Sequence, residues 1–379
     1  MMNKIKRNVL LNPGPATTTD TVKYAQVVPD ICPRESEFGT IMHELSEDLV
    51  KIVHGDPKKY TAVLFTGSGT LCIDATVSSL VPDGKRILIV NNGSYSDRAA
   101  EVCRYYHIDH YDMKLSEMEP ASPTYISSVL DNNRDIAVVY CCHHETGTGI
   151  LNPIGEIGKV AHDHGCIMIA DTTSSYAMRP INIEEENLDF IMASAQKGIM
   201  AMTGLSFVIG KKLEIEKSAN YHTRSYYTNL YLQYSFMKDK GEMHFTPPVQ
   251  TIYAARQGIS EYWAEGENEK WQRHHDTWKA ICKGAADLGI KMVIPAEMQS
   301  GLVALLQMPD DSNFIFNDVH DYCYERGFTI YPGKGSGSGV KAFRLCAYGT
   351  ITPDDIRAFF LVFKECMKHY DVQVPFHYY

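Results

Sequence analysis

The sequence lacks several features that would place it among membrane or secreted proteins. It has no uninterrupted apolar stretch of about 18 residues, so we expect no membrane span. The basic N-terminus, 1–7, is followed only by Leu10 and Leu11 before the sequence NPGP interrupts the chain, so we expect no signal segment. The ten cysteines form no spaced framework, and several lie inside apolar runs. This usage is typical of buried, reduced thiols in a cytoplasmic protein.

Positive charge is also in deficit. The chain has 46 acidic and 36 basic residues, which gives a formal net charge of −10. Such a chain repels phosphate backbones and anionic lipids, so we expect neither nucleic-acid binding nor membrane-surface binding. An anionic ligand would need a local cluster of positive groups. No linker rich in Pro, Gly or Ser divides the 379 residues, and single cores stop growing at roughly 250–300 residues. We therefore expect two closely packed domains.

Short apolar runs alternate with amphipathic stretches between residues 60 and 210. Near-continuous apolar strands separated by helices predict a mostly parallel sheet that is buried on both faces. After residue 255 the elements are shorter and mixed, apart from one long charged helix at 253–288, and they predict a smaller α+β domain. The expected strands of the sheet are 61–66, 86–90, 136–142, 166–170, 190–193 and 206–209. Three helices are expected: one that begins at residue 69, one at 97–106 and one at 154–164.

Four polar segments lie at the ends of these strands, where the active sites of such sheets are found. The first, 67–70 (GSGT), opens a helix, and its small residues and N–H groups can form an anion cradle. An ordinary capped turn is the alternative. The second, 143–149 (HHETGTG), is a polar loop or part of a site. Its histidines, His143 and His144, make a poor metal site because neighbouring side chains on a strand point to opposite faces.

The other two segments place a charged group at the end of a strand. Asp171 closes an apolar strand, where a carboxylate is unfavourable unless it meets a cation or several donors, such as a protonated pyridine nitrogen. Lys197 follows the next strand, and burial there would favour the neutral amine that forms a Schiff base. Taken singly, each residue has an ordinary alternative: Asp171 as a helix cap and Lys197 as a surface lysine. Their order, behind an anion cradle, matches the fold-type I pyridoxal-phosphate (PLP) enzymes.

Over almost the whole chain, these and further motifs resemble the class V aminotransferases, a family of fold-type I PLP enzymes. The resemblance implies an α/β fold with a mostly parallel seven-stranded sheet in a large PLP-binding domain, 15–260. It implies a smaller C-terminal α+β domain made of 1–14 and 261–379, and a homodimer. The further motifs are 10–15 (LLNPGP), 60–66 (YTAVLFT), 92–95 (NGSY), 245–248 (FTPP), 327–334 (GFTIYPGK) and 343–345 (FRL).

The resemblance also implies a role for each matching residue. Lys197 would carry PLP as a Schiff base and move the substrate proton, and Asp171 would pair with the pyridine nitrogen. The other expected cofactor contacts are Ser68, Gly69 and Thr70 at the phosphate, Gln196 beside the lysine, Tyr95 over the ring, Thr146 at the ring hydroxyl, and Thr246 at the phosphate across the dimer interface.

The stretches 331–334 and 343–349 resemble the aminoethylphosphonate branch of the family more narrowly. They imply ping-pong transfer of an amino group between 2-aminoethylphosphonate and alanine, with phosphonoacetaldehyde and pyruvate as carbonyl partners. A phosphonate dianion needs more than one positive group, and the candidates are Arg344 and Arg34. The glycine-rich stretch around Lys334 is a flap over the site or a surface hairpin.

Two other activities stay open at this point. Alanine–glyoxylate or serine–pyruvate transamination would use the same cofactor with a carboxylate substrate. A PLP-dependent lyase or desulfurase would need a catalytic cysteine on a mobile loop, and no cysteine has an obvious exposed setting between Gly and Ser residues.

Overall fold

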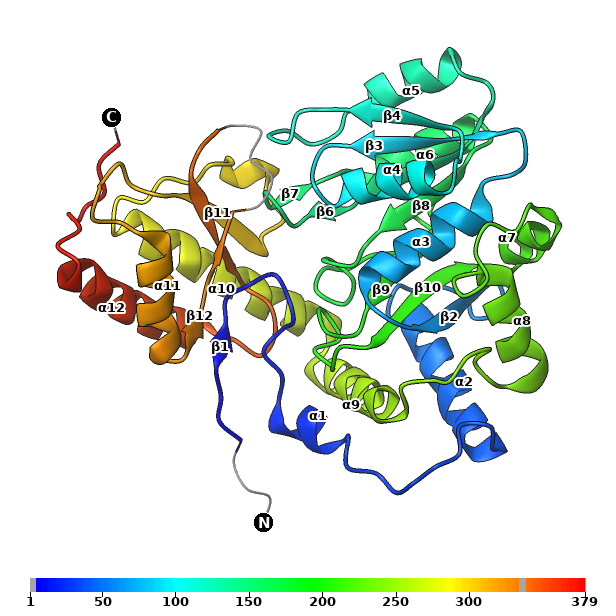
Figure 1. Ribbon diagram of the computed structural model, residues 1–379, viewed down its shortest axis with the longest axis horizontal. Helices are drawn as coiled ribbons and strands as arrows, with labels where there is room; N and C mark the ends of the chain where they lie inside the picture. Colours follow the sequence, from blue (N-terminus) through cyan, green and yellow to red (C-terminus); the bar gives the residue numbers. More distant parts are fainter. Residues whose placement is uncertain (1–4, 334–338, 379) are drawn as a thin grey trace.

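The computed structural model describes residues 5–333 and 339–378 (Figure 1). Its centre is a seven-stranded sheet with the order β2-β10-β9-β8-β5-β3-β4. β10 is antiparallel to β2 and β9, and every other neighbouring pair is parallel. The predicted seven-stranded, mostly parallel α/β sheet is thus confirmed. Its strands are β2 (Tyr60–Thr66), β3 (Arg86–Asn91), β4 (His110–Lys114), β5 (Ile136–Cys142), β8 (Ile167–Asp171), β9 (Phe190–Ser194) and β10 (Leu205–Lys211).

The sheet is buried on both faces because successive side chains of each strand enter two different cores. In β5, Val139 and Cys141 lie in one core, and Val138 and Tyr140 lie in the other. Burying a valine side chain contributes about 1.5–3 kcal/mol to the stability of the folded state. The first core is completed by α1 (Asp20–Tyr24), α2 (Ser36–Lys51), α5 (Pro123–Asp131), α6 (Ile154–Asp163) and α9 (Val249–Glu265). The second is completed by α3 (Gly69–Leu80), α4 (Ser96–Tyr105), α7 (Lys212–Lys217) and α8 (Leu230–Lys240).

A separate core surrounds a three-stranded antiparallel sheet with the order β11-β14-β13. The N-terminal strand β1 (Val9–Leu10) pairs in parallel with β12 (Phe328–Thr329), so the start of the chain packs against its C-terminal part. The domain limits 15–260 and 1–14 with 261–379 stay a prediction. The remaining elements are β6 (His144–Glu145), β7 (Ile150–Leu151), α10 (Glu267–Ala286), β11 (Val303–Gln307), α11 (Phe316–Glu325), β13 (Tyr331–Pro332), β14 (Ala342–Cys346) and α12 (Pro353–His369), with short 3-10 turns at Ser218–Asn220 and Ala296–Met298.

The predicted single helix at 253–288 is wrong. The structure has two helices here, α9 and α10, and Gly266 separates them with φ 92° and ψ 146°. Only glycine adopts such a conformation without strain, so the chain turns at this residue. The edge strand β4 was not predicted, because its sequence HYDMK is polar and mostly half-buried. The other elements predicted for the sheet and its helices agree with the structure to within two residues at each end.

Two further expectations concern membrane contact and thiols. Within 5–333 and 339–378, no helix is long and apolar enough to cross a bilayer. All ten cysteines are unpaired, and eight of them are buried. The segment around Lys334, predicted as a flap or hairpin, lies outside the described residues.

Candidate active site

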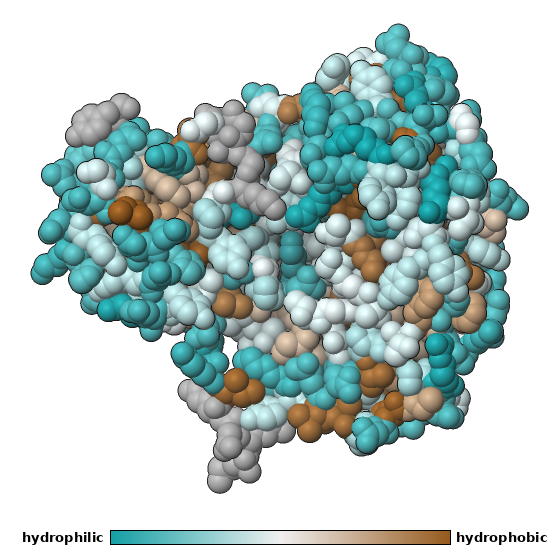
Figure 2. Space-filling view, viewed as in Figure 1, coloured by the Kyte–Doolittle hydropathy of each residue, from teal (hydrophilic) through white to brown (hydrophobic). Residues whose placement is uncertain are grey.

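The site lies at the carboxyl ends of the parallel strands. β8 and β9 are neighbours, so Asp171 at the end of β8 and Lys197 just after β9 reach the same edge of the sheet. Residues of the C-terminal part contact the loops at this edge: the Tyr348 hydroxyl donates to the Ser174 carbonyl at 3.4 Å. Figure 2 shows the molecule hollowed between the part that holds the large sheet and the part that holds α10 to α12.

Lys197 is buried, with 8% of its surface exposed. Its Nζ donates a hydrogen bond to Ser174 Oγ at 2.7 Å and lies 5.5 Å from the centre of the Tyr95 ring. Burial lowers the pKa of Lys197, and the nearby negative charge of Asp171 opposes that shift. Because the neutral amine is the nucleophilic form, this setting favours attack on a carbonyl.

Asp171 is a buried carboxylate that meets two hydrogen-bond donors. Its Oδ2 accepts from the Tyr140 hydroxyl at 3.2 Å, and its Oδ1 accepts from the Thr173 backbone N–H at 2.9 Å. Among the described residues no cation lies within ion-pair distance of it. A protonated ring nitrogen would supply the missing positive charge.

The predicted phosphate cradle lies at the start of α3. Ser68 is the N-cap of α3, yet its side chain makes no capping bond with the helix. Gly69 packs so closely against Thr173 that an added Cβ would lie 2.8 Å from Thr173 Cγ2. Three buried side-chain oxygens at or near this cradle have no hydrogen-bond partner in the described part of the chain: Thr173 Oγ1, Ser194 Oγ and Gln196 Oε1. These groups, with Lys197 and Asp171, fit a cofactor that has a phosphate, an aldehyde and a basic ring nitrogen.

Ser174 links the lysine to the 143–149 loop. Besides the bond from Lys197, its Oγ lies 2.5 Å from Thr146 Oγ1. Ser174 was not predicted as a site residue, since a serine near a strand end is common. Its contacts with Thr146 and Lys197 depend on the parallel pairing of β8 with β5 and with β9.

The two adjacent histidines bind separate protein groups. His143 Nδ1 lies 2.9 Å from Ser175 Oγ, while His144 contacts the Ser174 carbonyl at 2.9 Å and Ser300 Oγ at 3.0 Å. Over the ranges that the structure describes, no group of three or more His, Cys, Asp or Glu side chains is arranged to hold a metal ion.

Arg344 is a buried guanidinium on β14 with 4% of its surface exposed. Its Nη1 donates to the Thr146 carbonyl and its Nε to the Pro332 carbonyl, both at 3.1 Å. No carboxylate among residues 5–333 and 339–378 lies within 4.0 Å of its nitrogens. A buried positive charge whose hydrogen bonds within the described residues go to neutral carbonyls is suited to bind an anionic substrate group.

Tyr95 is held by a buried carboxylate, Glu145, that sequence analysis did not single out. The Glu145 carboxylate accepts from the backbone N–H of Tyr95 at 3.1 Å and of Ser96 at 3.2 Å, at the start of α4. Burial raises the pKa of Glu145 to about 7, and these N–H donors oppose the shift. The bonds fix the backbone that carries the Tyr95 ring.

Arg98 brings positive charge to the cradle and was also missed. Its guanidinium lies 4.8 Å from the centre of the Tyr95 ring, and its Nη1 donates to Thr70 Oγ1 at 3.1 Å. The available signal was spacing, because residues three apart on a helix share one face. Tyr95 and Arg98 stand in that relation at the start of α4.

Two predicted residues lie apart from this cluster within one chain. Arg34 donates to the Glu242 carboxylate and to the Met243 carbonyl, both at 2.7 Å. It lines a cavity of about 670 Å³ between α2 and α8, which no other predicted site residue lines. Thr246 is exposed, and its carbonyl accepts from Thr66 Oγ1 at 3.1 Å.

Comparisons with known proteins agree on one family. The model of that family, aminotransferase class-V, matches residues 19–299. The chain is 33% identical over 366 residues to the 2-aminoethylphosphonate–pyruvate transaminase of Phocaeicola vulgatus, covering 95% of this chain and 99% of that protein. It is 32% identical over 352 residues to the enzyme of the same name from Lactiplantibacillus plantarum, covering 92% and 95%.

Solved structures show the same fold at lower identity. Ureidoglycine–glyoxylate aminotransferase of Bacillus subtilis superposes with a TM-score of 0.89 at 17% identity, covering 99% of this chain and 96% of that one. Alanine–glyoxylate aminotransferase of Nostoc sp. gives 0.88 at 21% identity, covering 96% of each chain. With its sheet, its buried lysine and a family match over most of its length, the chain belongs to the class V aminotransferases, which use pyridoxal 5'-phosphate as cofactor.

Proposed function

We propose that this enzyme transfers the amino group of 2-aminoethylphosphonate to pyruvate, forming phosphonoacetaldehyde and L-alanine. The amino group and the carbonyl oxygen change places between the two carbon skeletons, so no oxidant or reductant is consumed. The observation that carries the proposal is the 33% identity to a transaminase of that name over 95% of the chain. The likeness to glyoxylate aminotransferases lies below 25% identity and supports the fold alone.

The chain's own residues would divide the work as follows. When bound, PLP supplies an aldehyde for the amine and a ring that accepts electrons. Lys197 Nζ would hold that aldehyde and would also move a proton at the substrate carbon, a role that its burial and lowered pKa support. Asp171 would keep the ring nitrogen protonated. Thr146 and Ser174, which contact each other, orient the groups around the lysine.

Arg344 is the proposed contact for the carboxylate of pyruvate and alanine, and for the phosphonate. Replacing it by glutamine is expected to raise the KM for pyruvate by about 10- to 150-fold, because a hydrogen bond to a charged group contributes roughly 1.5–3 kcal/mol. Steady-state kinetics with varied pyruvate measures this change. Arg357→Gln is the control, since Arg357 is exposed and pairs with Asp354. An unchanged KM in the folded variant contradicts the role.

Arg98 is the proposed positive charge at the cofactor phosphate. Arg98→Gln is expected to weaken PLP binding by ~2- to 5-fold, since a partly exposed charge contact contributes up to about 1 kcal/mol. Titration of the cofactor-free protein with PLP, followed by absorbance, gives the dissociation constant. Arg104→Gln on the same helix is the control, because Arg104 contacts Asp112. Equal constants for both variants would remove Arg98 from the cradle.

We also propose a cytoplasmic homodimer in which Thr246, and with it Arg34, serves the partner's site. A cluster of aromatic side chains with an exposed member supports the dimer. Tyr226 is 70% exposed, its ring centre lies 5.5 Å from that of Phe245, and the Tyr227 ring stacks on Phe245 with 4.5 Å between the ring centres. Tyr226→Asp is expected to shift the protein from dimer to monomer in sedimentation velocity and to lower turnover. Tyr105→Asp, at a residue that is 82% exposed, is the control. A variant at Tyr226 that stays dimeric, or an unchanged protein that is monomeric, argues against this interface.

The experiment that tests the function is a product assay. The purified holoenzyme is incubated with 2-aminoethylphosphonate and pyruvate, and alanine and phosphonoacetaldehyde are quantified. We expect both in equal amounts. Alanine with glyoxylate and serine with pyruvate are run in parallel, and faster turnover with either pair than with the phosphonate would favour the alternative transaminase. Pyruvate or sulfide released from cysteine would favour a lyase.

A further inference from the structure

α10 carries a fully buried lysine that pairs with no carboxylate of the described residues. Lys270 has no exposed surface, and its Nζ donates a hydrogen bond to the carbonyl of Gly198 at 2.6 Å. The same nitrogen lies 5.1 Å from the centre of the Tyr262 ring. No acidic side chain among the described residues lies within 4.0 Å of it. Burial lowers the pKa of Lys270 to about 7.

Such a residue is costly for the fold. A buried amine destabilises the folded state unless its charge is paired, and replacing buried charges by apolar groups is often neutral or stabilising. The described contacts of the Lys270 amine are a neutral carbonyl and an aromatic face, while the more distant carboxylates of Glu261 and Glu265 only partly oppose the effect of burial on its pKa. Its neighbour on the same helix, His274, is also fully buried, and its Nε2 has no hydrogen-bond partner within the described ranges. Stability alone therefore gives no reason for an amine at this position.

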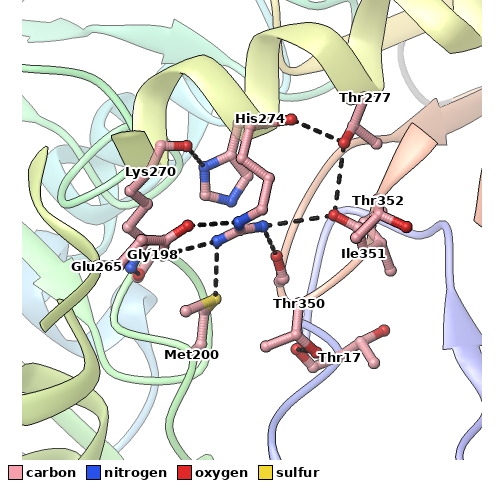
Figure 3. Close-up of polar contacts among 12 residues, drawn as sticks. Thr17, Gly198, Met200, Glu265, Lys270, His274, Thr277, Thr350, Ile351 and Thr352 are labelled. Atoms are coloured by element: carbon pink, nitrogen blue, oxygen red, sulfur yellow. Dashed lines mark hydrogen bonds and ion pairs between the residues drawn. The ribbon is translucent and has the colours of Figure 1, made fainter. Parts of the chain in front are cut away.

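The carbonyl that Lys270 contacts belongs to the residue after Lys197. Gly198 is buried in a turn closed by the bond from the Met200 N–H to the Lys197 carbonyl at 2.9 Å. An added Cβ at Gly198 would overlap the Tyr176 carbonyl, so the turn has no room to shift in that direction. Figure 3 shows Lys270 reaching from its helix to Gly198, with Met200 on the same turn below. The orientation of the peptide group between Lys197 and Gly198 determines the backbone position from which the Lys197 side chain extends.

The same helix also contacts the segment behind Arg344. Arg273 forms an ion pair with Glu265 at 2.5 Å and donates to the carbonyls of Gly349 at 2.6 Å and Ile351 at 3.4 Å. Gly349 follows β14, the strand that carries Arg344. α10 thus contacts both the turn that holds the lysine and the segment that follows the substrate-binding strand.

We propose that Lys270 is a positioning residue for the reaction: by holding the Gly198 carbonyl, it fixes the turn from which Lys197 reaches the cofactor and the substrate. The inference rests on the proposed role of Lys197 and deepens it. Without the Lys270 amine, the Gly198 carbonyl is buried with no donor, and the turn relaxes towards another partner. Lys197 Nζ then starts from a displaced backbone, and a misplacement of about 1 Å can cost 10²-fold in rate.

The test compares Lys270→Met with Lys279→Met in the full-length holoenzyme. Lys279 lies on the same helix, its side chain is 56% exposed, and it pairs with Asp276. For Lys270→Met we expect kcat to fall by about 10- to 100-fold with both KM values within about 3-fold. The visible circular dichroism of the bound cofactor is expected to change, because that signal reports how the cofactor is oriented at Lys197. The melting temperature should change by only a few degrees, because the removal of a buried charge offsets the cost of leaving the Gly198 carbonyl without a donor.

The outcomes separate this inference from the proposed function. A kcat for Lys270→Met within 2-fold of Lys279→Met, or a fall in activity that merely follows a loss of folded protein, overturns it. If Lys270→Met does not fold, Lys270→Gln, which keeps an amide donor, is measured in the same way and should lose less than 10-fold. If the unchanged protein binds no PLP at Lys197 or transfers no amino group, the proposed function fails first, whatever the variants do.

Discussion

Replacing Lys197 by alanine is expected to abolish both the visible absorption of the bound cofactor and amino transfer, with turnover falling by at least ~10³-fold. The buried amine is the proposed nucleophile, and it donates a hydrogen bond to Ser174 at 2.7 Å. Alanine removes both the covalent link to the cofactor and the group that moves the substrate proton. Absorption spectra of the PLP-loaded variant and steady-state rates measure the two effects.

The control for this variant is Lys159→Ala. Lys159 is a lysine with 67% of its side chain exposed, and it pairs with Asp163. Its removal should leave the absorption spectrum unchanged and the turnover within 2-fold of that of the unchanged enzyme. A Lys197→Ala protein that keeps more than a tenth of the turnover would show that another group performs the chemistry.

Asp171→Asn is expected to lower kcat by ~10²- to 10³-fold while the protein stays folded and still binds PLP. Asparagine keeps the size of the side chain and can still accept the Thr173 N–H, now 2.9 Å from Oδ1. It removes the negative charge that keeps the cofactor's ring nitrogen protonated, so the ring accepts electrons less readily when the substrate loses its proton. Stopped-flow absorbance of the half-reaction with alanine isolates this step from product release.

The matched control for Asp171 is Asp163→Asn, at an aspartate whose side chain is 57% exposed and which pairs with Lys159. We expect no change in its half-reaction rate. If Asp171→Asn reacts within 3-fold of the unchanged enzyme, the carboxylate does not serve the ring nitrogen. Its burial beside Tyr140 would then need another explanation.

The central sheet was predictable because its strands are buried on both faces. β5 and β10 are mostly apolar along their whole length, since both faces of each strand meet a core, and they can be recognised from their own sequence. β4 shows the limit: it is an edge strand, its sequence HYDMK is mostly polar, and only pairing with β3 makes it a strand. The break at Gly266 was missed because both flanking segments have helical character, so no local pattern marks the turn.

The sequence suggests site residues where one residue type at a strand end would carry the chemistry, as proposed for Lys197 and Asp171. Contacts between distant segments were not predictable. Ser174 lies 23 residues before Lys197 and gains its place only through the pairing of β8 with β9. Glu145 lies 50 residues after Tyr95, whose backbone N–H donates to its carboxylate. Lys270 lies 72 residues after Gly198, whose carbonyl accepts from its amine. Their roles depend on packing that no local pattern encodes.

The absorption spectrum of the PLP-loaded enzyme, recorded after mixing with each amine separately, tests both the cofactor link and the substrate. We expect 2-aminoethylphosphonate and L-alanine each to abolish the visible band of the lysine-linked cofactor. Pyruvate added after the first amine should restore the band, since the two halves of the reaction share one cofactor. A band lost with alanine but unaffected by 2-aminoethylphosphonate would contradict the proposed substrate, and a protein that forms no band with PLP would contradict the proposed role of Lys197.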